Sequence, residues 1–326
     1  MSQPKFTAAT TAEEVASVFQ EQIRGKNVLI TGTSINGIGF EAARVIAKYA
    51  NLVIITGYNT ERLKLSEEAI KKEIPGANVR PLILDLNSLA AVRKAAAEVS
   101  AYPEPLHVLI NNAASGGGKY KLTVDNLEEQ MAMDHIGPFL FTKLLAPKLL
   151  AARTANYTPR VIYVSSSTHA FGPGINLDMV ARGDPENFGT FARYFEAKSA
   201  NILSAIELSK RSQGKINGYS LHPGAIFTNI MQKEETRADF VQLGEFFLPG
   251  VLHPDGSPKT ELKTIPQGAA TTVTAAFNPE LDATPGAYLV DCVEANDQRA
   301  PHSSDADRAA KLWTITEGII GEEFVF

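Results

Sequence analysis

Short runs of β-branched and aliphatic residues recur along the chain and alternate with longer stretches whose apolar positions return every three or four residues. The run Val28–Thr31 has the composition of a strand buried on both faces. Phe40, Ala43 and Ala47 then follow at helical spacing. This pattern predicts strands at 27–31, 52–56, 79–84, 107–111, 160–165, 216–221 and 287–291, and helices near 38–50, 60–73, 88–100, 123–151, 190–213 and 265–277.

The alternation of strands and helices indicates the fold class. It predicts an α/β fold: a single Rossmann-like, doubly wound parallel sheet with helices on both faces. Neither repeats nor a low-complexity linker divide residues 26–326, so we expect one domain there. In such a sheet the ligand binds at the carboxyl ends of the strands.

Two long segments, 171–189 and 225–263, interrupt the alternation. Long loops at the binding edge of a sheet often form lids or substrate walls. The second segment is rich in Phe and Leu, so we expect a substrate lid there and a bulky apolar substrate. The alternative is that these aromatic residues only pin the loop to the core.

Residues 1–25 are predicted to form an amphipathic helical extension packed on the domain. Thr11 to Glu14 has the pattern of a capping box, and Val15, Val18, Phe19 and Ile23 follow at helical spacing. A membrane-surface helix is the alternative, but its polar face carries glutamates, which disfavour anionic lipid. The sequence contains neither a signal-peptide core nor an apolar run long enough to span a bilayer.

Composition narrows the class of protein. The 326 residues carry a net charge of −5, which does not indicate a nucleic-acid-binding surface. The single cysteine, Cys292, excludes an internal disulfide framework and favours a reducing compartment, so a cytoplasmic location is expected. Cys292 follows an apolar run and is predicted to be a small core residue of a late strand. No metal site is predicted.

A glycine-rich turn follows the first strand. The order strand, glycine turn, helix is the context of a dinucleotide site, where glycines let the backbone approach a pyrophosphate and the helix N-terminus supplies N–H groups. A tight turn before a packed helix is the alternative. The cofactor-binding residues expected here are Gly32, Ser34, Gly37, Ile38 and Gly39.

Tyr194 and Lys198 lie four residues apart in a predicted helix, so their side chains share a face. An ammonium beside a phenol favours the phenolate and lowers the phenol pKa from about 10. A tyrosine can then act as a general acid or base. The alternative is a surface tyrosine above a surface lysine.

Taken in order, six motifs resemble those of the short-chain dehydrogenase/reductase family, from about Gly25 to the C-terminus. The glycine turn resembles T-G-x-x-x-G-x-G, with one extra residue between Gly32 and Gly37. The remaining matches are Leu84-Asp85-Leu86, Asn111-Asn112-Ala113-Ala114 (with Ala114 where the family has Gly), Ser166, Tyr194 with Lys198 as Y-x-x-x-K, and Pro223-Gly224 with Thr228 as P-G-x-x-x-T.

The resemblance implies an NAD(P)-dependent oxidoreductase that interconverts a ketone or aldehyde with an alcohol. Ser166 would orient the substrate oxygen, Tyr194 would transfer the proton, and Lys198 would depress the Tyr194 pKa and bind the nicotinamide ribose. His135, His169 and Phe171 are expected only as pocket neighbours. The further cofactor contacts implied are Asp85, Leu86, Asn112, Ala113, Tyr194, Lys198, Pro223, Gly224 and Thr228.

Asp134 departs from the family pattern. The long interval from Ser166 to Tyr194 and the segment Met133–Leu145 resemble the retinol-dehydrogenase-like and fungal ketoreductase-like branches, which usually have Asn at this catalytic position. That Asn binds a water in a proton relay through the lysine. An ionised Asp only accepts hydrogen bonds. It could hold the water, or it could pair with Lys198 and weaken the effect of the lysine on Tyr194.

The end of the second strand bears on the choice of nicotinamide. No acid follows that strand to bind a ribose 2′-hydroxyl, as NAD-preferring folds require. Tyr58 stands where NADP-dependent relatives commonly have Arg, and Arg62 lies one turn into the next helix. We therefore expect NADP(H) to be preferred over NAD(H).

Other functions compete with this interpretation. A non-catalytic NAD(P)-binding regulatory protein on the same fold is the main alternative, since fold is a weaker guide to function than the site. A membrane-associated carrier would need an apolar anchor, which the sequence lacks. The expected partner is a small carbonyl or alcohol substrate, and the resemblance implies a homodimer through the helices beginning near 123 and 190.

Overall fold

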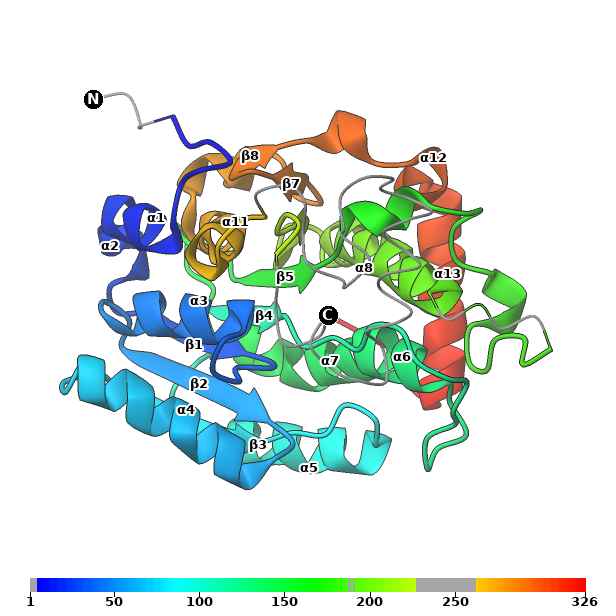
Figure 1. Ribbon diagram of the computed structural model, residues 1–326, viewed down its shortest axis with the longest axis horizontal. Coiled ribbons are helices and arrows are strands. Elements are labelled where there is room, and N and C mark those ends of the chain that lie inside the picture. Colours follow the sequence, from blue (N-terminus) through cyan, green and yellow to red (C-terminus); the bar gives the residue numbers. More distant parts are fainter. Residues whose placement is uncertain (1–4, 187–188, 190, 227–261) are drawn as a thin grey trace.

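The protein is built around one sheet of eight strands in the order β3-β2-β1-β4-β5-β6-β7-β8 (Figure 1). The computed structural model describes residues 5–186, 189, 191–226 and 262–326. Strands β1 to β7 pair in parallel and β8 pairs antiparallel with β7. The strands are β1 Asn27–Ile30, β2 Leu52–Gly57, β3 Val79–Ile83, β4 Val108–Asn111, β5 Arg160–Val164, β6 Asn217–His222, β7 Tyr288–Val290 and β8 Val293–Glu294.

The helices lie before, between and after these strands. Among the described helices, none is both long and apolar enough to cross a membrane. Their bounds are α1 Ala12–Val18, α2 Gln20–Ile23, α3 Ile38–Ala47, α4 Thr60–Glu73, α5 Leu89–Ser100, α6 Glu129–Met131, α7 Gly137–Leu150, α8 Ala192–Arg211, α11 Ile265–Phe277, α12 Pro301–Ser304 and α13 Ala306–Ile320.

The sheet buries a separate apolar core on each face. Successive strand residues point to opposite faces, so Val28 and Ile30 enter one core and Leu29 enters the other. Helices α1, α3, α4 and α11 cover the first face, and α5, α7, α8 and α13 cover the second (Figure 1). This is the predicted doubly wound α/β sheet. Its strand order reverses between β1 and β4, where such folds bind their ligands.

The strand predictions are confirmed for β1 to β7, each to within a residue at either end. The sequence pattern did not lead us to β8, α12 or α13. Cys292 is buried, as predicted, but it lies in the turn between β7 and β8 with a positive φ of 66° rather than in a strand. A two-residue turn with φ > 0 matches the right-handed twist of the paired strands.

The prediction of a single helix at 123–151 is wrong. Residues before Glu129 form turns, and a π-helical turn, η1 (Ala132–Ile136), separates α6 from α7. Pro138 has no N–H to bond the carbonyl four residues back, and the Gly137 N–H bonds Ala132 O, five residues back. A Cβ at Gly137 would lie 2.6 Å from Leu86 O, so the chain packs closely there.

The N-terminal helix begins as predicted. Thr11 and Glu14 form both hydrogen bonds of the capping box. Phe19 and Ile23 are buried in the core that contains α11. Val18 was predicted to share this apolar face, but it is 38% exposed. The helix is interrupted after Val18 and resumes as α2.

The insertion after β5 is fastened through its main chain. Arg193 pairs with Glu128 at 3.3 Å, and both side chains are almost completely buried. The donors and their main-chain acceptors are Arg193 Nη2 with Val180 O at 2.8 Å, Arg308 Nη2 with Ile175 O, and the Glu128 amide with Ala181 O at 2.8 Å.

The lid predicted at 225–263 lies largely outside the described residues. Its two described ends meet: Ile226 and Lys263 form a parallel bridge, and Lys263 N donates to Ala225 O at 2.9 Å. The lid itself therefore stays a prediction.

An aromatic cluster fixes α13 to the core. Trp313 is 2% exposed and its ring lies 4.7 Å from Phe139 of α7 and 5.0 Å from Phe324. Helix α13 also packs along α8. It thus occupies part of the surface of the two helices for which a homodimer contact was expected. The homodimer stays a prediction.

We expect Trp313→Ala to lower the free energy of unfolding by about 3–5 kcal/mol, because it removes a large buried side chain and leaves a cavity. The exposed neighbour Thr314 is the control, and its replacement by Ala should change stability by less than about 0.5 kcal/mol. Urea unfolding followed by circular dichroism measures both variants. Tryptophan fluorescence cannot be used, because Trp313 is the only tryptophan. A cost below about 1 kcal/mol, under the range for large core truncations, would contradict this packing.

Candidate active site

The carboxyl ends of β1 and β4 are joined by the side chain of Asn112. Its Nδ2 donates to Thr31 O at 2.9 Å and to Gly32 O at 3.0 Å. In return, Thr31 Oγ1 accepts from the amides of Asn112 and Ala113, each at 3.0 Å. These bonds hold the glycine turn against the loop after β4, at the point where the strand order reverses.

Two glycines of the turn leave no space for a side chain, because the turn packs directly against the loop after β4. A Cβ at Gly39 would lie 2.3 Å from Asn112 Nδ2, and one at Gly32 would lie 2.8 Å from Ala113 Cα. Gly32 has a positive φ of 72°, and Asn36, within the longer turn, has φ 64°, a conformation that Asn tolerates. Helix α3 begins after Gly37, whose lack of a side chain leaves its first N–H groups without a side-chain cap. The residues present therefore fit a dinucleotide pyrophosphate.

The residues expected to select the nicotinamide cofactor lie after β2. Tyr58 is 61% exposed, and Arg62 is exposed in the first turn of α4. Asn59 caps that helix: its side-chain oxygen accepts from Arg62 N at 2.9 Å, which fixes the position of the Arg62 main chain. Ser34 is likewise exposed, and Asp85 accepts from the Asn87 amide at 3.0 Å in the turn after β3.

Ser166, Tyr194 and Lys198 meet at the carboxyl end of β5. Ser166 follows that strand, and the other two lie one turn apart on α8. The Ser166 hydroxyl acts on the Tyr194 phenol and lowers its pKa, and Lys198 Nζ lies 5.1 Å from the centroid of the Tyr194 ring. Lys198 Nζ also donates to Val164 O at 3.2 Å, and Ser165 Oγ donates to Lys198 O at 2.7 Å, which tie α8 to β5.

Asp134 joins this group from the π-helical turn η1. Its Oδ2 lies 3.1 Å from Lys198 Nζ, and its Oδ1 accepts from Ser115 N at 2.7 Å. Burial by itself would lower the pKa of Lys198, but Asp134 and the Tyr194 phenol outweigh burial and raise that pKa. Of the two roles considered for Asp134, the structure shows the pairing with Lys198.

The electrostatics of Tyr194 differ from the simple expectation for a tyrosine beside a lysine. Burial raises its pKa, Lys198 lowers it, Asp134 raises it, and the hydrogen bond from Ser166 lowers it; the balance is a pKa above the ordinary value. The lowering by Lys198 is therefore present but outweighed.

The segment after β6 lies along the same edge of the sheet. Gly224 has a positive φ of 102°, and a Cβ there would lie 2.5 Å from Lys263 Cδ. Pro223 is buried. Thr228, expected to act with these two residues, lies outside the described residues.

The histidines proposed as pocket neighbours are structural. His169 Nδ1 bonds Ser166 O at 2.7 Å and its Nε2 accepts from Ala300 N at 3.2 Å. His135 is completely enclosed, bonds Thr316 Oγ1 at 2.9 Å, and burial lowers its pKa to about 3. Across the described ranges, no three His, Cys, Asp or Glu side chains gather as a metal site.

The sequence did not predict three residues that support the site. Thr31 was quoted only as part of the glycine motif, although its hydroxyl accepts both amides of the β4 loop. Ser115 and Gly117 lie in that loop, and their amides donate to Asp134 and Gln130. The glycine run at 116–118 was the available signal for a loop that needs such anchoring.

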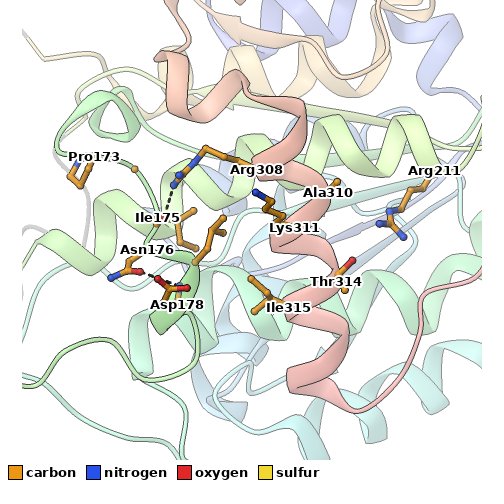
Figure 2. A pocket seen from close by; sticks show the side chains of 12 residues that line it. Pro173, Ile175, Asn176, Asp178, Arg211, Arg308, Ala310, Lys311, Thr314 and Ile315 are labelled. Atoms are coloured by element: carbon orange, nitrogen blue, oxygen red, sulfur yellow. Dashed lines mark hydrogen bonds between the residues drawn. The ribbon is translucent and has the colours of Figure 1, made fainter.

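A cavity of about 810 Å³ lies apart from this group, between α13 and residues 173–178 (Figure 2). None of the residues at the carboxyl end of β5 lines it. Its arginines are already engaged: Arg308 donates to Ile175 O, and Arg211 pairs with Glu207 at 2.7 Å. We therefore assign the chemistry to the sheet edge and not to this cavity.

Known proteins resemble this chain over most of its length. The sequence profile of the short chain dehydrogenase family matches residues 26–176. The short-chain dehydrogenase TIC 32 B, chloroplastic, from Brassica napus is 34% identical over 319 residues, which are 95% of this chain and 93% of that protein. Because that relative is named as chloroplastic, a cytoplasmic location for this chain stays a prediction.

Solved structures show the same fold. An uncharacterized protein from Mycobacterium paratuberculosis matches with a TM-score of 0.69 at 27% identity, over 99% of this chain and 100% of that chain. The 3-oxoacyl (acyl-carrier-protein) reductase of Agrobacterium tumefaciens C58, solved with NADP bound, matches with a TM-score of 0.62 at 18% identity, over 83% of this chain and 95% of that chain. With a relative that is similar over nearly the whole of both chains, this protein belongs to the short-chain dehydrogenase/reductase family of oxidoreductases.

Proposed function

We propose that this chain is an NAD(P)-dependent oxidoreductase that interconverts a ketone or aldehyde with an alcohol, with Tyr194 as general acid and base. The observation that carries this proposal is the gathering of Ser166, Tyr194 and Lys198 at the carboxyl end of β5, with Lys198 Nζ 5.1 Å from the centroid of the Tyr194 ring. This group lies at the same sheet edge as the glycine turn. A non-catalytic regulator has no need for such an arrangement.

Each side chain has a distinct part in the proposed reaction. A bound nicotinamide supplies or accepts a hydride at the substrate carbon. Ser166 donates a hydrogen bond to the substrate oxygen, and this bond strengthens as negative charge develops there. Tyr194 gives its proton to that oxygen during reduction and recovers it during oxidation. Lys198 holds positive charge beside the phenol and, by family resemblance, binds the nicotinamide ribose.

The remaining residues would hold the cofactor. Gly32, Gly37 and Gly39 form the cradle for the pyrophosphate, with the amides of Ile38 and its neighbours at the start of α3. The other proposed contacts are Ser34, Tyr58, Arg62, Asp85, Leu86, Asn112, Ala113, Pro223, Gly224 and Thr228.

Aromatic side chains beside Tyr194 support a bulky apolar substrate. The ring of Phe195 lies 6.5 Å from that of Tyr194, 5.3 Å from that of Phe171 and 6.3 Å from that of Phe191. Apolar and aromatic walls with few polar groups are typical of small-molecule sites. The ketoreductase assignment rests on this aromatic cluster together with the acid–base group.

The first test is turnover. Purified protein is mixed with NADPH and a panel of apolar ketones and aldehydes, and the loss of reduced-nicotinamide absorbance is followed. Tyr194→Phe should slow turnover by about 10²–10⁴-fold, because it removes the general acid, and should leave NADPH binding unchanged. Tyr102→Phe, remote at the end of α5, is the control. NADPH binding without any turnover would favour the regulatory alternative, and full activity in Tyr194→Phe would remove the role of Tyr194.

Ser166→Ala should lower kcat by about 10²–10³-fold, since one hydrogen bond to the developing oxyanion is lost. The exposed neighbour Ser167 provides the control, and Ser167→Ala should keep wild-type kcat. The opposite result, full activity in Ser166→Ala and loss in Ser167→Ala, would move the role to Ser167.

NADPH should bind more tightly than NADH, and Arg62→Ala should reduce this preference. A lost hydrogen bond from a charged group is worth about 1.5–3 kcal/mol, so the Kd for NADPH should rise by about 10–100-fold, while the Kd for NADH stays almost constant. Lys64→Ala removes the same charge from the same exposed helix and should change neither. Titration calorimetry measures the Kd of each variant for both cofactors. An equal loss of affinity for NADPH and NADH would show that Arg62 does not select the phosphate.

A further inference from the structure

Two hydrogen-bond donors face the two oxygens of Asp134. The side chain is completely buried, with Ser115 N 2.7 Å from Oδ1 and Lys198 Nζ 3.1 Å from Oδ2. An asparagine could offer one oxygen to one donor, but its NH₂ group would then face the other donor. The surroundings of residue 134 therefore match a carboxylate and conflict with an amide.

Few charged groups act on the Asp134 carboxyl. Burial raises the pKa of the Asp134 carboxyl above its ordinary value, although the ammonium and the Ser115 amide both stabilise the anion. We assign the charged form because the ammonium nitrogen lies only 3.1 Å from Oδ2 and the amide donates to Oδ1 at 2.7 Å. The other acid that acts on Asp134 is Glu128, which is itself paired with Arg193 at 3.3 Å. Among the described residues, the groups acting on Tyr194 are Lys198, Asp134 and Ser166.

The pairing changes what Tyr194 experiences. The nearest counter-ion of the ammonium is the carboxylate, 3.1 Å from Nζ, and the centroid of the Tyr194 ring lies 5.1 Å from Nζ. A compact ion pair presents little net positive charge to a third group. The phenol is therefore deprived of much of the stabilisation that an uncompensated ammonium gives to a phenolate.

We propose that Asp134 neutralises Lys198 toward Tyr194, so that the phenol keeps its proton at neutral pH and the site is set for carbonyl reduction. This rests on the proposed function. The carbonyl carbon gains the hydride of a reduced nicotinamide, the C=O π electrons move to oxygen, and that oxygen takes the Tyr194 proton. The tyrosinate then recovers a proton from water. Oxidation needs the tyrosinate first and is confined to alkaline pH.

The sign of the pH dependence follows from this arrangement. Reduction should be constant through neutral pH and fall as pH rises through the Tyr194 pKa, whereas oxidation should rise through the same value. Asp134→Asn removes the negative charge, and one charge at this range shifts a pKa by about 1–3 units. The fall of the reduction rate and the rise of the oxidation rate should both move to lower pH by that amount. Oxidation at pH 7 should then increase about tenfold or more.

The experiment compares kcat/KM against pH in both directions for wild type, Asp134→Asn and Glu129→Gln. Glu129 is a neighbouring acid paired with Lys121 outside the site, so its variant should follow wild type. Limbs that do not move in Asp134→Asn, or that move to higher pH, would overturn the proposal.

A second measurement needs neither turnover nor a folded Asp134 variant. Tyrosinate absorbance of the cofactor-free wild type is titrated against that of Tyr194→Phe, so that the difference isolates Tyr194. We expect ionisation above about pH 10, the ordinary value for tyrosine. Ionisation near neutral pH would overturn the charge neutralisation even in an active enzyme. A Tyr194 pKa above about 10 in a protein without turnover would agree with the charge neutralisation and contradict the oxidoreductase function.

Discussion

The hydrogen bonds of one amide side chain, Asn112, determine the geometry of the site. Because its Nδ2 bonds the carbonyls of both Thr31 and Gly32, the loop after β4 lies directly against the turn after β1. That proximity leaves no space for a side chain at Gly39. The rest of the site comes from the segments that follow other strands at the same edge of the sheet, and from η1 and α8.

Much of the fold was available from the sequence because buried parallel strands are marked by continuous β-branched runs. What was missed has physical reasons. Helix α13 does carry a helical repeat at Ala309, Leu312, Trp313 and Thr316, so its signal was present and not used. The π-helical turn has a local signal in Pro138, but the close approach of Gly137 to Leu86 joins segments far apart in the sequence and gives no local signal.

The site was predictable in composition and less so in its electrostatics. Motif order placed Ser166, Tyr194 and Lys198 at one edge, and the structure brings them together. Charged residues such as Glu128 and Arg193 look like surface residues in a sequence, yet both are buried in a mutual ion pair. Because a sequence does not show burial, His135 and His169 were also candidates for the pocket, although both are fixed within the fold.

The fastening of the segment after β5 bears on how this protein can diversify. Arg193 and Arg308 hold that segment through its carbonyl oxygens at Val180 and Ile175, and every amino acid supplies a carbonyl oxygen. Side chains along the segment can therefore be exchanged over generations while its attachment to α8 and α13 is retained. Because attachment uses the main chain and leaves the side chains free, descendants of this protein can acquire new surface chemistry on an unchanged fold. The two arginines are then the positions least free to vary.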